Sequence, residues 1–210
     1  MQLHRPFRVI TPTVDGDVLA ALARADSAFT GRGLHRVIGR HSVDGVRKSL
    51  DRLAEQGIVD VEDVGPAKSY RLNRDHLVAE HIVSIATSFE SLVDRLRNRL
   101  TKWRIAPAYA AIFGSAVRDD MRPDSDIDLF IVRKDAVEED DTRWSAQLHR
   151  LSRDASRWTG NDVRVLEVSS TEARRGVRAK KQVYVDIQRE GVRLLGPETY
   201  LRSISLRRAQ

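Results

Sequence analysis

Along the first 57 residues, apolar side chains recur at helical spacing in three short stretches. These stretches contain Val18, Leu19, Leu22 and Ala23; then Leu34, Val37 and Ile38; and then Val46, Leu50, Leu53 and Ala54. Thr30 and Ser42 stand where the second and third stretches begin, and both residue types are favoured helix N-caps. Gly39 and Gly57 stand just after those stretches, where glycine commonly ends a helix. The pattern predicts three short helices.

Two β-rich segments follow the third predicted helix. They run from Ile58 to Val64 and from Ser69 to Leu72, and residues 65–68 join them as a hairpin loop. Helix, helix, turn, helix and hairpin is the element order of a winged helix-turn-helix domain. The stretch from Ser42 to Val59 resembles the recognition helix and first wing strand of bacterial winged-helix regulators. We therefore expect residues 1–74 to form a winged helix-turn-helix domain.

Basic residues of the third helix lie off its apolar stripe. If the stripe faces the core, these residues are free to meet DNA phosphates or base edges in a major groove. The expected DNA-binding residues are Ser42, Arg47, Lys48 and Arg52, with Lys68 from the hairpin. The alternative is a small protein-interaction domain whose basic residues are only solvated. DNA binding is the favoured interpretation.

A third pattern connects this region to the C-terminal half. Eight apolar residues from Val78 to Trp103 are spaced by 4, 3, 4, 3, 4, 4 and 3 positions, which is nearly a heptad seam. No glycine or proline interrupts residues 75–104, so we expect one long connecting helix there. The seam can pair with its copy in a second chain to form a homodimer, or it can pack inside its own chain. The homodimer is slightly favoured.

The sharpest chemical pattern lies between Ala111 and Val132. An apolar strand runs into Gly114 and Ser115, a short helical segment follows, and Asp126 and Asp128 stand at the start of a second apolar strand. Side chains two apart on a strand share a face, so the two aspartates can converge on one site. Paired carboxylates on a rigid strand suit a hard divalent cation such as Mg²⁺. A glycine there lets the backbone approach a phosphate closely.

This stretch resembles the minimal nucleotidyltransferase domain of the polymerase-β superfamily. The residues that meet the signature are Gly114, Ser115, Arg118, Ser125, Asp126, Asp128 and Leu129, whereas Asp119 stands where the family often has glycine. The resemblance covers about residues 105–197. It implies an α/β (α+β) fold with a mixed sheet in a domain of residues 105–210.

The same resemblance assigns roles to these residues. Asp126 and Asp128 would be the catalytic residues and would hold Mg²⁺, the expected cofactor. The nucleotide-binding residues would be Gly114, Ser115, Arg118 and Ser125. The nucleotide would be an NTP, with ATP as the expected donor.

One family feature is not met. Enzymes of this family usually place a third carboxylate on the next strand, and Arg164 stands at the matching position of this sequence. Asp162 lies two residues earlier on the same strand face. Glu167 lies three residues later, on the opposite face unless a β-bulge intervenes. Either residue could replace the missing acid, or the domain is inactive, and the sequence leaves this open.

Composition and charge exclude several kinds of site and favour certain partners. The chain has 210 residues, a net charge of +6 and no cysteine, which excludes disulfides, thiolate metal sites and a cysteine nucleophile. The basic excess favours polyanionic partners. No apolar run is long enough for a membrane helix, and the N-terminus lacks the apolar stretch of a signal peptide. We expect a cytoplasmic protein without a membrane partner.

Two functions from different classes follow. The first is a Mg²⁺-dependent nucleotidyltransferase that moves AMP from an NTP to a hydroxyl of a protein, an RNA or a small molecule, and that also binds DNA. The resemblance makes a toxin–antitoxin or defence setting reasonable. The alternative is a winged-helix transcriptional regulator whose second domain is a nucleotide sensor or an inactive relic.

Overall fold

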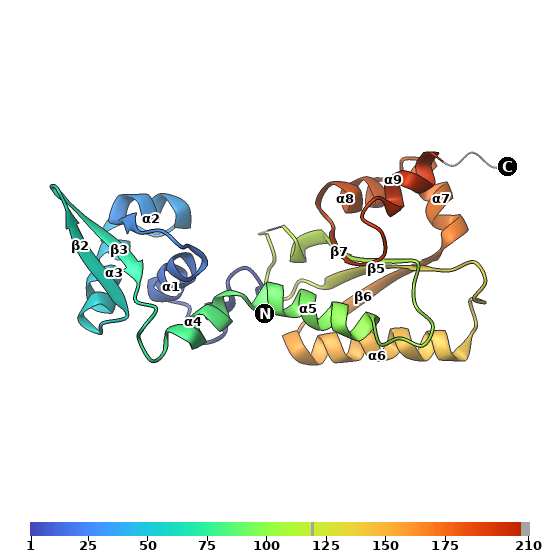
Figure 1. The fold of residues 1–210 in the computed structure, drawn as a ribbon, viewed down its shortest axis with the longest axis horizontal. Coiled ribbons are helices and arrows are strands. Elements are labelled where there is room, and N and C mark those ends of the chain that lie inside the picture. Colours follow the sequence, from blue (N-terminus) through green and yellow to red (C-terminus); the bar gives the residue numbers. More distant parts are fainter. Residues whose placement is uncertain (119, 207–210) are drawn as a thin grey trace. The chain divides into compact units, whose positions relative to one another are not determined.

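The computed structural model divides the chain into two compact units. One unit contains residues 2–88, and the other contains residue 1 and residues 89–210 (Figure 1). The structure describes residues 1–118 and 120–206. Asp119, where the sequence departs from the family signature, therefore lies outside the described residues.

The unit of residues 2–88 combines short helices with a small sheet. Its elements are a 3₁₀ helix at Pro6–Val9, α1 (Val14–Arg24), β1 (Phe29–Thr30), α2 (Gly31–Ile38), α3 (Val43–Glu55), β2 (Val59–Val64), β3 (Ala67–Leu72) and α4 (Ala79–Ala86). The sheet has the order β1-β3-β2, and both pairings are antiparallel. The side chains of Thr30 and Ser42 accept hydrogen bonds from Gly33 N (3.1 Å) and Gly45 N (3.0 Å), which confirms both expected N-caps.

The predicted stripe of α3 forms the centre of this unit's core. Val46 and Leu50 are fully buried, and they belong to one apolar cluster with Val18 of α1 and Leu34 of α2. The hairpin turn is tighter than the sequence suggested. Val64 pairs directly with Ala67, so the turn consists of residues 65–66, and Lys68 lies inside β3 rather than in a loop.

The stretch of residues 75–104 contains two helices rather than the single helix expected. They are α4 and α5 (Ser88–Leu100), and residue 87 separates them. Arg24 donates two hydrogen bonds to the carbonyl oxygen of Ala86, at 3.0 and 2.9 Å. The hydroxyl of Ser88 donates to the carbonyl oxygen of Ile85 at 2.6 Å, and that of Thr87 donates to Val83. Arg24 and Ser88 thus occupy the carbonyls of Ala86 and Ile85, which a continuing helix would need for its own N–H groups.

Part of the predicted seam in the same stretch is buried within one chain. Ile82 is buried in the core of the first unit, and Leu92, Leu96 and Leu100 of α5 are buried as well. Burial within one chain was the alternative to the homodimer. A dimer through residues 75–104 would have to use the seam residues that are less buried, such as Val78, Ile85 and Phe89, and the homodimer stays a prediction.

The unit of residues 89–210 is built around a four-stranded sheet. Its further elements are β4 (Tyr109–Phe113), a 3₁₀ helix at Gly114–Ala116, β5 (Ile127–Arg133), α6 (Thr142–Thr159), β6 (Val163–Ser169), α7 (Ser170–Arg178), α8 (Gln182–Glu190), β7 (Val192–Leu195) and α9 (Tyr200–Leu206). The strand order is β6-β5-β4-β7. The β5–β6 pair is parallel and the other two pairs are antiparallel, which confirms a mixed sheet.

Helices cover both faces of this sheet. Figure 1 shows α5 and α6 on one face and α7, α8 and α9 on the other. Phe130 and Val132 of β5 belong to the apolar cluster that contains Tyr184 of α8, so their face of β5 points toward α8. Side chains alternate along a strand, and Arg133 accordingly lies on the α6 face. Among the described residues, no helix combines the length and the apolar character that crossing a bilayer requires.

We expect Leu96→Ala to lower the free energy of unfolding of this unit by about 2–5 kcal/mol, because it removes a fully buried side chain from α5. Urea unfolding followed by tryptophan fluorescence measures this, since all three tryptophans lie in residues 89–210. Leu166→Ala is the matched control, because Leu166 is 37% exposed. Equal losses for the two variants would contradict the burial of α5.

Candidate active site

Asp126 and Asp128 lie at the start of β5, as the sequence predicts. Asp128 is the second residue of the strand, and Asp126 is the residue just before the strand begins. Alternation places both on the α8 face together with Phe130, whose ring packs edge-on against Tyr184 with 5.6 Å between the ring centroids. Both aspartates are half-buried. The strand therefore carries two carboxylates on one face, above an apolar layer that holds β5 in place.

Gly114 lies directly beside the carboxylate of Asp128. Its φ of +74° is a left-handed conformation that favours glycine. The preceding residue, Phe113, pairs with Asp128 in the antiparallel β4–β5 ladder. A Cβ atom on residue 114 would lie 2.6 Å from Asp128 Oδ2. Glycine is thus required here twice, for the backbone conformation and for the space that the carboxylate occupies.

The charge of Asp126 and the burial of Asp128 disfavour ionisation of Asp128. Burial is the larger effect, and together they raise the pKa of Asp128 above its ordinary value. Arg164 and Arg118 act in the opposite direction. Two carboxylates that repel each other next to a glycine turn form a site where a cation would be stabilised.

Arg164 lies at the position where the family resemblance expects a third acid. In the parallel β5–β6 ladder Arg164 is the register partner of Asp128. Its guanidinium forms an ion pair with Asp126, with 2.8 Å between Arg164 Nη2 and Asp126 Oδ2. The side chain of Arg164 is 75% exposed, and an ion pair that exposed is weak and readily exchanged.

The two candidate replacements for the third acid do not join the aspartates. Glu167 accepts hydrogen bonds from Arg133 Nε at 2.7 Å and from Trp144 Nε1 at 3.2 Å, on the α6 face of the sheet. Asp162 is exposed, and its backbone carbonyl accepts from Ile127 N at 2.8 Å. In residues 1–118 and 120–206 no group of three His, Asp or Glu side chains is placed to hold a metal ion.

The donor set nevertheless fits Mg²⁺ in the presence of a nucleotide. Magnesium is commonly bound by one or two carboxylates together with substrate phosphates and water, without a complete protein cage. Asp126 and Asp128 supply two hard oxygen donors. Burial and, to a smaller extent, the charge of Asp126 raise the pKa of Asp128, and a cation would favour its ionised form. Arg164 would have to leave Asp126 Oδ2 for that oxygen to bind metal.

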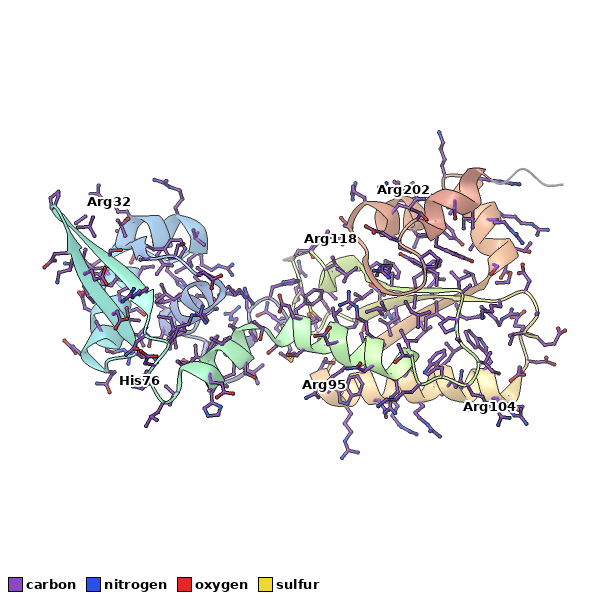
Figure 2. The ribbon with its side chains drawn as sticks, viewed as in Figure 1. Arg32, His76, Arg95, Arg104, Arg118 and Arg202 are labelled. Carbon is purple, nitrogen blue, oxygen red and sulfur yellow. The ribbon has the colours of Figure 1, made fainter. Side chains whose placement is uncertain are left out.

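Three further residues expected at the site lie close to the aspartates in sequence. Arg118, labelled in Figure 2, donates to Glu190 Oε1 of α8 at 2.6 Å and to Asp120 Oδ2 at 3.3 Å. Ser115 lies in the 3₁₀ turn that begins at Gly114. The hydroxyl of Ser125 accepts from Arg122 N at 2.9 Å, which shapes the loop before β5. Sequence reasoning missed Glu190, because its pairing with Arg118 spans 72 positions.

The expected DNA-binding residues lie in the other unit, and their surroundings differ. Arg47 and Lys48 are 63% and 74% exposed on α3, and both pair with Asp44. Arg52 pairs with Asp15 of α1 at 2.5 Å, so it ties two helices together. Ser42 is exposed and caps α3, and Lys68 is exposed on β3.

A cluster of basic residues in the unit of residues 89–210 was also not identified from the sequence. It consists of five basic side chains from α5, the segment after it and α6 that line a cavity. The residues are scattered over 50 positions, although Arg143, Gln147 and Arg150 stand at i, i+4 and i+7 on one helical face. That spacing was a detectable signal.

Comparisons with known proteins identify one family model. The family model described as "Nucleotidyltransferase domain" matches residues 93–198. Among proteins of curated function, none matches the sequence significantly. A structure described as "Crystal structure of the toxin-antitoxin with AMP-PNP" shares 14% identity and a TM-score of 0.36, covering 56% of this chain and 81% of that one.

A second structure is described as "Crystal structure the toxin-antitoxin MntA-HpeT mutant-D39ED41E". It shares 13% identity and a TM-score of 0.37, and the match covers 54% of this chain and 81% of that one. Similarity at this level has no bearing on the function of the chain.

The raised pKa of Asp128 predicts a specific pH dependence of stability. Because the folded chain binds this proton more tightly than the unfolded chain does, ionisation of Asp128 costs stability as pH rises through the raised pKa. We expect Asp128→Asn to gain stability relative to the parent protein as pH rises from about 4 through the raised pKa of Asp128, with little difference at lower pH. Melting temperatures across this range measure the difference.

The control for this experiment is Asp124→Asn, which removes an exposed carboxylate from the same loop. The control should show no pH-dependent gain. A difference between Asp128→Asn and the parent protein that stays constant with pH would contradict the assignment.

Proposed function

The chain belongs to the nucleotidyltransferase domain family, and from that premise we propose that it transfers a nucleoside monophosphate, with AMP expected, from an NTP to an acceptor hydroxyl. The acceptor is a hydroxyl of a protein, an RNA or a small molecule. The observation that carries the proposal is the pair of Asp126 and Asp128 on one face of β5, against the glycine turn at Gly114.

The chemistry follows from where charge must be stabilised. The acceptor hydroxyl releases its proton to solvent and its oxygen bonds to the α-phosphorus. The bond from that phosphorus to the bridging oxygen breaks, and pyrophosphate leaves with the bridging oxygen. Asp126 and Asp128 would hold Mg²⁺, which supplies charge neutralisation of the phosphates when bound. Gly114 and Ser115 offer a close backbone approach and a hydroxyl to the phosphates. Arg118 contributes positive charge that Glu190 orients.

Arg164 has a defined part in this proposal. When the triphosphate binds, its anionic oxygens can replace Asp126 as the partner of the Arg164 guanidinium, because a fork of N–H donors suits phosphate as well as carboxylate. That exchange would release Asp126 for the metal.

The ion pair of Arg164 also favours a second candidate function. With a cation at the position of the third acid, the site retains phosphate affinity while the proton of an acceptor hydroxyl lacks a carboxylate to receive it. Such a domain would act as a nucleotide sensor or an inactive relic attached to a regulator.

Transfer of label from α-labelled NTPs to cell-extract acceptors in the presence of Mg²⁺ tests the enzyme. We expect Asp126→Asn or Asp128→Asn to reduce transfer by at least about 100-fold, because a metal contributes several kcal/mol to such a reaction. Arg164→Asp should raise the rate, since it places a third carboxylate next to Asp128 in register.

The matched control for the aspartate variants is Asp124→Asn, which should transfer label at the parental rate. If the parent protein transfers no label while Arg164→Asp does, the domain is a relic that one residue inactivates. If neither transfers label and NTP changes the DNA affinity of the chain, the sensor replaces the enzyme.

We further propose that residues 2–88 form a winged helix that binds DNA. The order α1, β1, α2, α3, β2, β3 with a three-stranded antiparallel sheet supports this, as does the exposure of Arg47 and Lys48 on α3. Their ion pairs with Asp44 are exposed and hence weak, so phosphates can displace Asp44. Arg52 is the least available of the expected contacts, because Asp15 holds it.

DNA binding through α3 predicts a change in salt dependence. Arg47→Ala combined with Lys48→Ala should weaken binding to a duplex oligonucleotide and reduce the slope of log K against log salt by about 1.8, the loss of two phosphate contacts. Fluorescence anisotropy of a labelled duplex at several salt concentrations measures both. Arg175→Ala with Lys180→Ala removes two exposed charges from the other unit and should leave the slope unchanged. A binding constant that does not change with salt concentration would overturn the proposal.

A further inference from the structure

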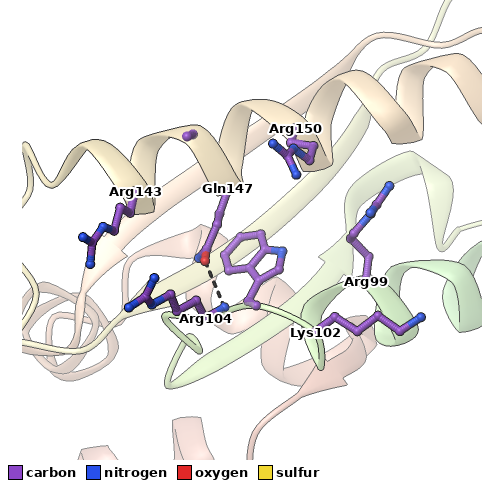
Figure 3. Close-up of a pocket in the computed structure, with 8 residues that line it drawn as sticks. Arg99, Lys102, Arg104, Arg143, Gln147 and Arg150 are labelled. Atoms are coloured by element: carbon purple, nitrogen blue, oxygen red, sulfur yellow. Dashed lines mark hydrogen bonds between the residues drawn. The ribbon is translucent and has the colours of Figure 1, made fainter.

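A basic groove lies on the α6 side of the second unit. We define it by Arg99, Lys102, Trp103, Arg104, Arg143 and Arg150, which line a cavity of about 430 Å³ (Figure 3). Arg99 comes from α5, and residues 102–104 come from the segment that follows α5. Arg143 and Arg150 come from α6. Among the described residues that line this cavity there is no carboxylate.

Most of these cations are unpaired. Arg99 is held by Asp154. In the described part of the chain, Lys102, Arg104, Arg143 and Arg150 form no ion pair, and all four are exposed. Five positive charges around one concavity repel each other, and they focus a positive potential on the space between them. The electrostatics of the groove are therefore complementary to an anion with more than one charge.

The walls of the groove are fixed relative to each other. Gln147 of α6 accepts hydrogen bonds from Arg104 N at 3.0 Å and Ile105 N at 3.2 Å, and it donates to Ile105 O at 3.0 Å. Figure 3 shows Arg143 and Arg150 on the helix opposite Arg104 and Lys102. Three bonds from one side chain hold the backbone of residues 104–105 against α6, so the two cationic walls keep a fixed separation.

The spacing of the cations suits a ligand with several phosphates. Arg143 and Arg150 are seven residues apart on α6, which is about 10.5 Å along the helix axis. Two arginines at that spacing can contact different phosphates of one strand. Arginine side chains on both walls suit phosphate oxygens, because each guanidinium offers a planar fork of donors.

Trp103 adds a surface for a nucleobase. Its ring lines the cavity and packs edge-on against Trp144, with 5.4 Å between the ring centroids. A cationic track with an aromatic ring inside it is the arrangement by which proteins hold single strands, through phosphate contacts and base stacking. An acidic polypeptide would use the charges without using the ring.

We propose that the basic groove binds a single strand of nucleic acid through its phosphodiester backbone, with a base stacked on Trp103. The groove faces α5 and α6, whereas Asp126 and Asp128 point to the α8 face of the same sheet. It is therefore a site separate from the proposed transferase centre, and it does not depend on that centre being active.

Fluorescence anisotropy of labelled 12-nucleotide RNA and DNA strands with the full-length protein tests the proposal. Arg143→Gln combined with Arg150→Gln should weaken binding about 25-fold at 0.1 M salt and reduce the salt slope by about 1.4, which is the loss of two single-strand phosphate contacts. The two probes distinguish RNA from DNA as the source of the strand. Trp103→Phe should remove part of the tryptophan quenching that accompanies binding.

The matched control is Arg175→Gln combined with Lys180→Gln, which removes the same charge from exposed positions of α7 and the turn after it. Its affinity should equal that of the parent protein. Equal weakening in both variants would mean unspecific attraction and would overturn the proposal. The proposal would also be overturned if Arg47→Ala combined with Lys48→Ala lost binding while Arg143→Gln combined with Arg150→Gln kept it. The strand would then lie on α3.

Two competitors separate the remaining ligand classes. Polyglutamate of equal charge that displaces the strand equally well would replace nucleic acid by an acidic protein partner. If inorganic triphosphate displaces the strand at equal concentration, the groove binds small anions rather than a nucleic-acid strand. Displacement by unlabelled oligonucleotide alone supports the proposal.

Discussion

The mutual approach of two carboxylates on β5 is the constraint on which the candidate active site depends. Strand geometry forces Asp126 and Asp128 onto one face. Burial of Asp128 raises its pKa, and the charge of Asp126 raises it further. The chain offsets this repulsion with Arg164, the register partner of Asp128 on β6. A metal–nucleotide complex would offset the same charge. Arg164 and a metal–nucleotide complex therefore compete for the carboxylate of Asp126. The outcome of this competition distinguishes the enzyme hypothesis from the sensor hypothesis.

The register of the sheet is what brings these groups together, and contacts on its opposite face stabilise that register. Arg133 at the end of β5 pairs with Glu167 of β6 at 2.7 Å, and Trp144 of α6 donates to the same carboxylate. Because Arg133 is almost fully buried, losing its partner would leave an uncompensated charge, and a shifted register is disfavoured. Glu167 thus has a structural role that excludes it from the aspartate site.

The candidate sites on the two sides of this sheet attract ligands of opposite charge. The α8 face presents carboxylates that attract a cation, and the α6 side presents the basic groove, which attracts a polyanion. If both proposals hold, the unit of residues 89–210 can bind nucleotide and strand at once, because the sheet separates the two sites. The proposed winged helix would add a duplex-binding surface in the other unit, so three separate surfaces would recognise phosphate chemistry.

Local pattern alone was sufficient for most of the helices and strands, the caps at Thr30 and Ser42, and the placement of Asp126 and Asp128 on one strand face, because periodicity and short spacings encode them. The mixed sheet was expected only from the family resemblance. Local pattern was insufficient at residue 87, where Arg24 takes the carbonyl of Ala86 from a distant helix and ends α4. The partner of Arg118, the roles of Arg164 and Glu167, and the basic groove likewise arose only on folding. Each depends on side chains tens of positions apart, and a single sequence does not show which distant segments meet. Only the α6 wall of the groove left a periodic signal, in the i, i+4 and i+7 spacing of Arg143, Gln147 and Arg150.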